Sequence, residues 1–580
     1  MVRMKKTGKR TMARFARTFL LPMSLPVRLA LSTIMVVLAI WPNIASAQEP
    51  LEAMPAALTK VVIAPPRSAV ARTLKISLKA DYEAAERASR QYQQAQKLYF
   101  FYGGRGFEPL WVQTGGDGRF VLTSQAEQIL DVLKDAASEG LRSEDYLTPE
   151  LDLAAVGTDA VAAAALEAAF SRSVAAYAQD AYGGRVDPRA VSKLITLSPK
   201  RIDEADLILR LASSAAPKDV LRDLSPKHPE FIRLRAMLTS FKEETLEVTQ
   251  TVIPNGPPLK PGMRDDRVPL LRERLAITAP EIPEGAADAS VDLTYDEELV
   301  AGVRAFQEAW GLEADGVLGP ATAAALNSKS DMTKDNIIAN MERWRWEPDE
   351  LGAFRVEVNI PQFELSILSG SEIVHRTRVV VGRPQNQTPI FSDEIESVVV
   401  NPYWNVPSTI AANEIRPKLL ADPYYLAGQN MELLAGARVV DAAAIDWAST
   451  NINAYRIRQR PGEGNALGKV KFLFPNEHDV YLHDTPSKSL FARAYRAYSH
   501  GCVRVENPFD FAEALLATNP TVTRAKLEDL FGDKERWVSL DTHIPVHLMY
   551  FTLRIDEDGT VRSYGDVYGH NAKLIQLLNS

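Results

Sequence analysis

The sequence predicts a multidomain α+β protein, and three observations lead to this prediction. Its 580 residues are several times the length of a typical domain of ~150 residues. An alanine-rich helical pattern runs from about Leu78 to Lys242 and is interrupted by Gly-Gly and Pro turns. Beyond residue 352, apolar and polar residues alternate with the period of two that is typical of β-strands. We therefore expect a helical domain, a small three-helix domain and a mostly-β domain with a helical cap insertion.

The N-terminus has the composition of a secretory signal. Residues 1–28 contain eight Lys or Arg and no acidic residue, and the 13-residue, mostly apolar stretch Leu29–Trp41 follows. With the Ala-Ser-Ala motif at 45–47, these are the three parts of a cleavable signal, so we predict a signal peptide over 1–47. The apolar stretch is shorter than the ~20 residues that span a bilayer, and an uncleaved inner-membrane anchor is the alternative.

Charge and cysteine content narrow the function classes. Removal of the signal leaves 580 − 47 = 533 residues and a formal charge of −8 − 8 = −16, which argues against nucleic acid as a partner. The single cysteine, Cys502, cannot form the internal disulfide that exported proteins usually make. Most lone cysteines are small buried apolar residues, but a free thiol in an oxidising compartment favours a chemical role.

The first half of the mature chain is predicted to be helical. Residues 48–77 are rich in Pro and Ala without a sustained period, which indicates a flexible tether. Residues 78–252 are predicted to form a helical scaffold domain, in which amphipathic runs such as 159–180 pack on one another. An aromatic cluster around Tyr102 and Trp111 fits the core of such a domain.

A small module is predicted over residues 257–328. Val268, Leu271 and Leu275 follow helical spacing, Gly316 suits a turn with positive φ, and Pro320 suits the first position of a helix. The module resembles the three-helix peptidoglycan-binding domain of cell-wall enzymes, through Gly262, Val268, Leu271, Leu275, Phe306, Gln307, Asp315, Gly316, Gly319 and Thr322. Arg272 stands where that family usually has Gln, so glycan binding and a purely structural role both stay open.

The C-terminal half is predicted to contain a connecting helix over 333–350 and a β-rich domain over 352–540. A helical segment punctuated by Pro and Gly, residues 408–469, interrupts this domain and is expected to cap its site. Residues 541–580 are expected to form a β-hairpin around the turn Asp556–Gly559 and a tail.

The chemistry of the chain is expected at Cys502. It lies in the segment Ser499-His500-Gly501-Cys502-Val503-Arg504, 502 − 483 = 19 residues after His483. A free cysteine titrates near ~8.5 and needs a base to become a good nucleophile at neutral pH. A histidine, titrating near ~6.5, is suited to accept that proton. The segment therefore predicts a thiol enzyme.

With these motifs the chain resembles the YkuD-type L,D-transpeptidases. It is most similar to the large, multi-domain proteobacterial type, which joins a helical scaffold, a peptidoglycan-binding module and a capped catalytic domain. Many small YkuD domains carry Asn where Arg504 stands, whereas Arg is common in the large type. The motifs that carry the resemblance are residues 359–363, 381–384, 388–389, 401–407, 481–484 and 499–504.

The resemblance implies a peptidoglycan L,D-transpeptidase in the periplasm. Cys502 would attack the carbonyl of a stem diamino acid joined to D-alanine, and His483, oriented by the backbone carbonyl of Asp484, would move the protons. The amine of another stem would resolve the thioester and give a 3→3 cross-link. Peptide stems and glycan are the implied partners, a peptidoglycan synthase is a candidate partner, and β-lactams of the carbapenem class would acylate Cys502.

Neighbouring residues are expected to complete the site. Backbone N–H groups around Gly501 and Cys502 would hold the oxyanion, each donor contributing ~3 kcal/mol, while Ser499 and His500 order the loop. Arg504 is expected either to bind a substrate carboxylate or to form a structural salt bridge. Tyr481 and Trp404 are expected to line the cleft.

No cofactor and no metal are expected. A metal site made of His483, His500 and Cys502 would lack a carboxylate or a second thiolate, and it would consume the nucleophile. The other six histidines show no ligand-like spacing: His228, His375, His478, His543, His547 and His570.

Three alternatives stay open at this point. With water as the acceptor the same acyl-enzyme would make an L,D-carboxypeptidase. With an amine of an outer-membrane protein it would attach that protein to the wall. The third alternative is a non-catalytic wall-binding scaffold, because the helical half and the binding module occupy about half of the mature chain.

Overall fold

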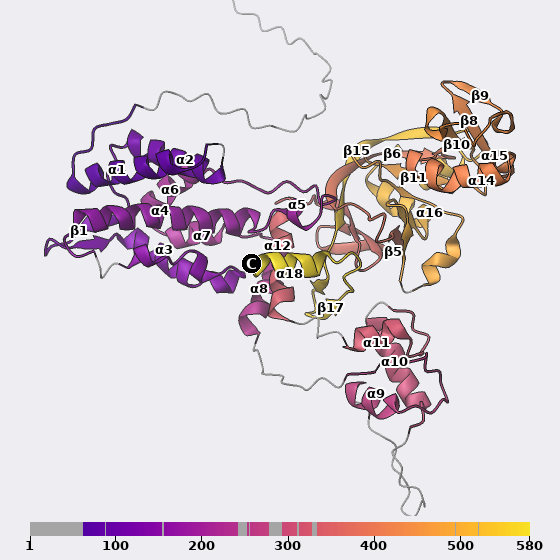
Figure 1. Ribbon diagram of the computed structural model, residues 1–580, viewed down its shortest axis with the longest axis horizontal. Helices are drawn as coiled ribbons and strands as arrows, with labels where there is room; N and C mark the ends of the chain where they lie inside the picture. The colour runs from indigo at the N-terminus through magenta and orange to yellow at the C-terminus, as the bar shows by residue number, and fades with distance from the viewer. Residues whose placement is uncertain are drawn as a thin grey trace, which may run out of the picture. The chain divides into compact units, whose positions relative to one another are not determined.

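The structure is a computed structural model that describes residues 62–241, 252–327 and 333–580, except 88, 153–155, 255, 276, 278–292, 310–311, 494 and 520. The predicted signal peptide and residues 48–61 of the predicted tether lie outside these residues. The fold class is as predicted: a helical N-terminal region, a small helical module and a mostly-β C-terminal domain (Figure 1).

The N-terminal region packs its helices around α4. Residues on all sides of this 24-residue helix are buried, including Phe170 and Tyr177, because its alanines let the neighbouring helices approach closely. A hairpin of β1 (Val112–Thr114) and β2 (Phe120–Leu122) joins the helices. The helices are α1 (Ala69–Ala84), α2 (Arg90–Gly104), α3 (Ser124–Lys134), α4 (Ala160–Gly183), α5 (Pro188–Val191), α6 (Glu204–Ser213), α7 (Pro217–Arg222) and α8 (Pro229–Ser240).

The tether prediction is wrong from Ala69 onward. The side chain of Ser68 accepts a hydrogen bond from the N–H of Ala71 and so caps α1. Leu74 and Leu78 of this helix are buried in the helical core. The helical spacing of apolar residues that begins at Val70 was not recognised, because the residues before it are rich in Pro.

The small module has the three predicted helices, α9 (Arg267–Leu275), α10 (Glu297–Ala309) and α11 (Pro320–Asn327). Gly316 has a φ of 71°, and Pro320 is the first residue of α11. Gln307 is buried, and its side-chain amide accepts from the N–H of Gly316 and donates to Thr322. Arg272 is buried as well and pairs with Asp296, so its guanidinium takes part in the interior of the module.

Helix α12 (Lys334–Trp346) connects the helical region to the β domain. Thr333 caps it, and every residue from Ala339 to Trp346 is buried. On one side Asn340 accepts hydrogen bonds from the N–H groups of Thr552 and Leu553 in the C-terminal part of the chain. This helix is therefore packed by protein on both sides.

The β domain is built on a nine-stranded sheet with the order β13-β5-β14-β12-β11-β6-β15-β3-β4. Because β4 also pairs with β5, the strands from β5 to β4 close into a barrel. The strands are β3 (Phe354–Asn359), β4 (Glu364–Ser369), β5 (Glu372–Gly382), β6 (Phe391–Val400), β11 (Val470–Leu473), β12 (Leu482–His483), β13 (Ala497–Ser499), β14 (Val503–Val505) and β15 (Arg536–Met549).

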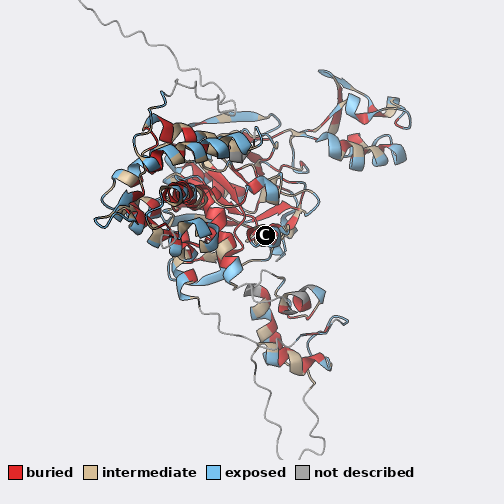
Figure 2. Ribbon diagram, turned by 60° about the vertical axis from the view of Figure 1, so that its left-hand side comes forward, coloured by how far each residue is buried: buried red, intermediate tan, exposed pale blue. Residues whose placement is uncertain are grey.

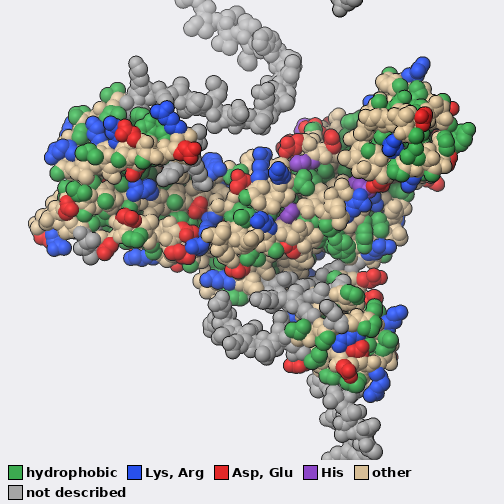
Figure 3. All heavy atoms as spheres, viewed as in Figure 1, with side chains coloured by type: hydrophobic (Ala, Val, Ile, Leu, Met, Phe, Trp, Pro, Cys, Tyr) green, Lys and Arg blue, Asp and Glu red, His purple; other side chains and the backbone are tan. Residues whose placement is uncertain are grey.

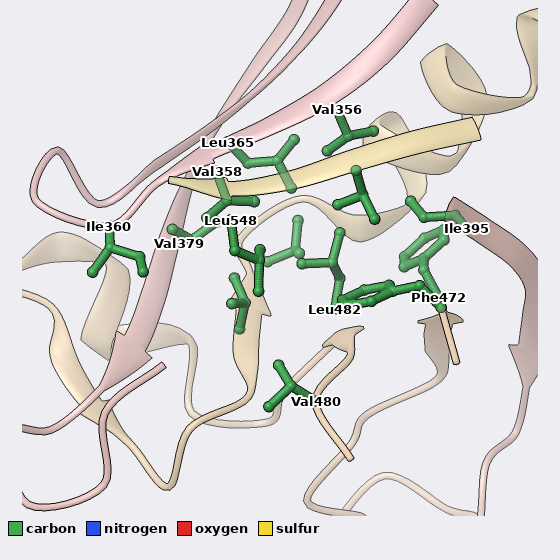
Figure 4. Close-up of a cluster of buried hydrophobic side chains, with 14 of the residues drawn as sticks. Val356, Val358, Ile360, Leu365, Val379, Ile395, Phe472, Val480, Leu482 and Leu548 are labelled. Carbon is green, nitrogen blue, oxygen red and sulfur yellow. The ribbon is translucent and has the colours of Figure 1, made fainter. Parts of the chain in front are cut away.

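Inward-facing side chains of these strands form the largest apolar cluster of the domain. Figure 4 shows Val356 and Val358 of β3 beside Leu548 of β15, with Phe472 and Leu482 on the other side of the core. The central strands are the most buried elements, and exposed residues lie on the outer faces of the helices (Figure 2). This core fixes the positions of the strands that carry the predicted catalytic residues.

The predicted boundary at residue 540 is wrong. Strand β15 runs from Arg536 to Met549 and pairs with both β3 and β6, so residues 541–549 belong to the main sheet. The predicted hairpin is shorter, β16 (Leu553–Ile555) and β17 (Val561–Ser563), and helix α18 (His570–Leu578) replaces the predicted tail. The alternating pattern did not show the break at Phe551 and Thr552, whose N–H groups bond to side-chain amides.

The insertion carries the predicted helices together with a four-stranded sheet. The sheet has the order β7-β10-β8-β9, and residues such as Leu433, Trp447 and Ile457 form a separate apolar core. The elements are β7 (Trp404–Asn405), α13 (Ser408–Ile410), the π-helix η5 (Ala411–Ile415), α14 (Arg416–Ala421), α15 (Tyr425–Gly428), β8 (Met431–Ala435), β9 (Arg438–Val440) and β10 (Arg456–Gln459).

Two surface properties bear on function. Among the described residues, no helix combines the length and the apolar character needed to cross a bilayer. On the face drawn in Figure 3, Lys and Arg side chains are interspersed with Asp and Glu side chains and gather in no large basic area.

Candidate active site

The predicted base, His483, lies on β12, and the predicted nucleophile, Cys502, comes directly before the neighbouring strand β14. Strand β12 pairs in parallel with β14, so that Leu482 lies opposite Val503 and His483 lies opposite Arg504. The N–H of Val503 donates to the carbonyl of Tyr481 at 3.2 Å, which extends this pairing toward Cys502. His483 and Cys502, which are 19 residues apart in the sequence, therefore lie at neighbouring positions of the sheet.

Four of the predicted site residues share one face of the sheet. Side chains two positions apart on a strand point to the same face, which groups Cys502 with Arg504 and Tyr481 with His483. The rings of Tyr481 and His483 confirm this orientation, with centroids 5.6 Å apart in an edge-on arrangement. The thiol, the imidazole, the phenol and the guanidinium therefore lie side by side.

His483 is buried and held in place by the main chain. Its Nδ1 lies 2.5 Å from the carbonyl oxygen of Asp484, the contact that the sequence analysis expected for this carbonyl. Nδ1 therefore carries the proton, and Nε2 is left to accept one. The Asp484 carboxylate in turn accepts from Thr485 N–H and from Lys488 and fixes the turn.

Burial sets the protonation of the two reactive groups. Desolvation, with a smaller contribution from the Arg504 charge, lowers the pKa of His483 to about 3. Desolvation also raises the pKa of the Cys502 thiol to about 11, although hydrogen bonds from Tyr481 and the Arg504 charge act in the opposite direction. At neutral pH the pair is therefore a neutral thiol and a neutral imidazole.

In the resting conformation the thiol of Cys502 does not donate to His483. It donates instead to the backbone carbonyl of Asp479, 3.9 Å away, and Cys502 is partly exposed. Asp479 has a φ of 53°, which is unusual for a residue with a side chain and marks a tight turn before β12. Catalytic hydrogen bonds often tighten only when substrate binds. The sequence analysis missed Asp479, since its part is played by the backbone.

The loop before Cys502 is ordered by Ser499. Its hydroxyl donates to the carbonyl of Cys502 at 2.5 Å and accepts from the N–H of Gly501 at 3.1 Å. The Gly501 N–H, predicted as an oxyanion donor together with that of Cys502, thus donates to Ser499 in this conformation, whereas the Cys502 N–H has no partner among the described residues. Gly501 itself is required because its φ is 120°, a conformation that a side chain would strain.

Arg504 has no partner in this site. Its guanidinium forms no hydrogen bond or ion pair with another described residue, and its buried Nε is unsatisfied. Desolvation lowers the pKa of Arg504, and the neighbouring Cys502 acts in the opposite direction. Of the two roles predicted for Arg504, the structural salt bridge is absent from the described part of the chain.

His500 faces the insertion rather than the thiol. Its Nε2 lies 2.6 Å from the carboxylate of Glu414 in η5 and 3.0 Å from the guanidinium of Arg383. The insertion therefore touches the nucleophile loop, in agreement with its prediction as a cap. Trp404 lies on β7 and packs against the core of the insertion, and no contact with Cys502 or His483 appears among the described residues.

One site residue was not predicted from sequence. Lys471 of β11 lies opposite His483 in the sheet and is only 7% exposed. Its sequence neighbourhood of Val470 and Phe472 gave no sign of a functional residue, because a strand lysine usually faces water.

Neither a metal site nor a large pocket marks this site. Within the described ranges, no three His, Cys, Asp or Glu side chains form a group that could hold a metal ion. A cavity of about 500 Å³ does lie between α8 and β4, but it is lined by paired charges such as Arg554 and Glu230 and includes neither Cys502 nor His483.

Comparisons with known proteins agree with the domain composition. The L,D-transpeptidase catalytic domain YkuD matches residues 353–524, a putative peptidoglycan binding domain matches 264–326, and a scaffold domain matches 96–238. A putative L,D-transpeptidase of Haemophilus influenzae is 36% identical over 250 residues, which are 43% of this chain and 50% of that protein. The amidase CwlL (N-acetylmuramoyl-L-alanine amidase) of Bacillus licheniformis is 35% identical over 87 residues, 15% of this chain and 23% of that protein.

The chain thus spans about half, or less, of the length of these curated relatives. Among solved structures, an L,D-transpeptidase from Mycobacterium smegmatis is similar over 34% of this chain and 58% of that chain, with 12% identity and a TM-score of 0.17. A similarity of this size does not establish a fold, so the assignment rests on the three matching domains.

Proposed function

We propose that this chain, which contains a YkuD-type L,D-transpeptidase catalytic domain with a peptidoglycan-binding and a scaffold domain, is a peptidoglycan L,D-transpeptidase that forms 3→3 cross-links. The observation that carries the proposal is the common face of β12 and β14, where a thiol, a neutral imidazole and an unpaired guanidinium lie together. Acyl transfer by a thiol needs a nucleophile, a base and a means of holding an anionic substrate, and these three groups supply them.

The first half-reaction forms a thioester. The sulfur of Cys502 attacks the carbonyl of the stem diamino acid, and His483 accepts the thiol proton through Nε2. Since both groups are neutral at rest, the proton moves during the attack rather than before it. The bond to D-alanine then breaks, and His483 returns the proton to the departing amine.

The second half-reaction forms the cross-link. The side-chain amine of another stem attacks the thioester, the C–S bond breaks and a new amide bond forms. His483 takes the amine proton and returns it to the sulfur. The Cys502 N–H, which has no hydrogen-bond partner among the described residues, is the backbone donor assigned to the oxyanion in both steps.

The same proposal covers location and partners. The basic and apolar segments of residues 1–47 support export to the periplasm, where peptide stems and glycan are found. The module at 264–326 supports binding to the glycan, and a peptidoglycan synthase is a candidate partner. A carbapenem would acylate Cys502, because its β-lactam carbonyl is an acyl donor for the same thiol.

Mass spectrometry of the products from a purified disaccharide-tetrapeptide tests the proposal, with Cys502→Ala as the control. A cross-linked dimer that lacks one D-alanine, absent in the control, is the expected result. Tripeptide alone would replace the proposal with an L,D-carboxypeptidase. Formation of an amide to an added outer-membrane protein would indicate a wall-attachment enzyme. No conversion by folded protein, with full complementation by Cys502→Ala in cells, would indicate a non-catalytic scaffold.

A further inference from the structure

Two cations flank the imidazole of the proposed base. His483 lies opposite Arg504 on the β14 side and opposite Lys471 on the β11 side. Residues directly opposite one another on neighbouring strands place their side chains on the same face of the sheet. Lys471, His483 and Arg504 therefore form a row across three strands, next to Cys502.

The ammonium of Lys471 lies between two aromatic rings. Its Nζ is 5.6 Å from the centroid of Tyr481 and 5.6 Å from the centroid of Trp537. The residue as a whole is 7% exposed, whereas Trp537 is 61% exposed. The ammonium thus lies beside a ring that is largely exposed to solvent.

The described residues give this charge no direct partner. Within the described residues, the Lys471 ammonium has neither an ion pair nor a hydrogen bond. The nearby carboxylate of Glu535 is occupied, because it accepts from the N–H of Tyr403 at 2.9 Å and from Nε1 of Trp537 at 3.1 Å. Burial lowers the pKa of Lys471, and the charge of Glu535 acts in the opposite direction.

A buried cation without an anionic partner is costly, and an anionic ligand would remove that cost. Cation–π contacts compensate only a part of it. The substrate of the proposed function carries carboxylates close to the scissile bond, and a carboxylate matches a single ammonium in charge. Lys471 and Arg504 together offer two such positions, one on each side of His483.

We propose that Lys471 is a substrate-binding residue that holds a carboxylate of the peptide stem beside Cys502, with Tyr481 and Trp537 as the aromatic walls of its subsite. This inference rests on the proposed function for the identity of the ligand. Two carboxylates of a donor stem could occupy the subsite: the C-terminal carboxylate of D-alanine, or the side-chain carboxylate of a diamino acid that carries one.

Binding of synthetic tetrapeptide stems to the full chain with Cys502→Ala tests the inference without turnover. Isothermal titration calorimetry would use three stems: one with both carboxylates free, one amidated at D-alanine, and one amidated on the diamino acid. Each is titrated into the Cys502→Ala protein and into the same protein with Lys471→Met, which keeps the apolar stem of lysine and removes its charge.

We expect Lys471→Met to weaken binding of the unmodified stem roughly ten- to a hundredfold, as for loss of a hydrogen bond to a charged group. Amidation of the carboxylate that Lys471 holds should weaken binding to the parent protein by a similar factor, and should have no further effect on Lys471→Met. The position of that amide identifies the carboxylate. Lys471→Arg should restore most of the affinity, since it keeps the charge.

The matched control is Lys469→Met, two residues earlier on the same face of the chain. The Lys469 ammonium also lies over an aromatic ring, 5.7 Å from the centroid of Phe531, but this residue is exposed. Its substitution should leave the affinity for all three stems unchanged. Thermal melting of each variant confirms that it is folded, and Lys471→Gln, which also removes the charge, replaces Lys471→Met if the latter is not.

Two results would overturn the inference. Equal affinity of Lys471→Met and the parent protein for the unmodified stem would remove any role in binding. An equal loss for all three stems would show that Lys471 acts without a carboxylate. Either result, together with normal formation of the 3→3 dimer by the wild-type enzyme, leaves the proposed function intact. A wild-type enzyme that binds no stem and forms no dimer would contradict both.

Discussion

The catalytic sheet is bordered by two regions that are attached to it in different ways. On one side the helical region is joined through α12, in which Glu342 and Arg345 are almost completely buried. Arg345 donates to the carbonyls of Glu139 and Ala181, and Glu342 accepts from the N–H of Val186 at 2.8 Å. On the other side, the insertion meets the nucleophile loop through Glu414 and His500, both of which are substantially exposed.

The apolar cores of the two regions also differ in how they are joined to the catalytic sheet. Val186, Ile195 and Leu197 of the helical region belong to the core of the catalytic sheet, and the Ile195–Ile390 bridge adds backbone hydrogen bonds. The insertion has its own core around Leu419 and Trp447. A shared core unfolds together, whereas a separate core can move or unfold by itself. The α12 side therefore supports the active site, and the insertion side is suited to control access to it.

The largest effect is expected from breaking the buried pair in α12. Glu342→Ala leaves the guanidinium of Arg345 without its anionic partner and the N–H of Val186 without its acceptor. Loss of one member of a buried ion pair costs about 3–5 kcal/mol. Urea denaturation followed by far-UV circular dichroism should show a lower midpoint for the helical region and the catalytic sheet together. Separate shifts of the two would contradict a shared core.

Acid should weaken the same side of the molecule. His228 is stacked on Trp344 of α12, with ring centroids 3.8 Å apart, and desolvation lowers its pKa to about 4. The folded state favours the neutral imidazole, and this preference stabilises the folded protein fully above pH 6.5. The stabilisation is lost as the pH falls from 6.5 to 4, and the loss is at most about 3 kcal/mol.

Denaturation midpoints measured between pH 7 and pH 4 check this expectation. His228→Phe keeps an aromatic ring against Trp344 and cannot titrate, so its pH dependence should be flatter than that of the wild type. Four other histidines, whose pKa values burial also lowers, would contribute to the slope that is left: His375, His483, His547 and His570. Identical slopes for both proteins would exclude His228 as a source.

Removal of the insertion should lower the stability of the catalytic sheet less than Glu342→Ala does. The N–H of Val406 donates to the carbonyl of Ile457 at 2.9 Å, so these two residues are antiparallel neighbours at the base of the insertion. An Asn-Gly turn in place of residues 407–456 would join them as a two-residue hairpin. We expect the free energy of unfolding of the remaining protein to lie within about 1 kcal/mol of the value for the full chain. A loss as large as that of Glu342→Ala would contradict the independence of the insertion.

The smallest effect on stability is expected at the contact between the insertion and the loop. Glu414→Gln weakens the exposed contacts of this carboxylate with His500 and Arg383, which contribute at most about 1 kcal/mol to folding. A free-energy change of at most about 1 kcal/mol can raise the fraction of molecules with an accessible Cys502 by about fivefold at most. We therefore expect Cys502 to be acylated faster, by no more than this factor. Rates of thiol acylation by a carbapenem would measure it, with the exposed Glu463→Gln of the same insertion as the control. Slower acylation of Glu414→Gln would show that the contact positions the loop.

Much of this organisation could be predicted from the sequence, and the limits have physical causes. Cys502 and His483 were found because a local motif surrounds each of them. Helix α1 was missed because its apolar spacing follows a Pro-rich segment, and the break after β15 was missed because side-chain amides, rather than a turn motif, end the strand.

Properties that depend on pairing between strands distant in the sequence cannot be predicted from a single sequence. The closure of the barrel through β4 and β5, and the position of Lys471 opposite His483, follow from the register of the strands. The occupied Gly501 N–H and the contact of the thiol with Asp479 depend on loop conformation, which residue types do not determine.

Intact-protein mass spectrometry after incubation with a donor tetrapeptide, without acceptor, tests most directly whether Cys502 forms an acyl-enzyme. We expect an added mass equal to the stem minus D-alanine, located by proteolysis on the peptide that contains Cys502 and absent from Cys502→Ala. His483→Ala should acquire the adduct far more slowly. Cross-linked product formed at the wild-type rate by Cys502→Ala, or an adduct on another residue, would contradict this expectation.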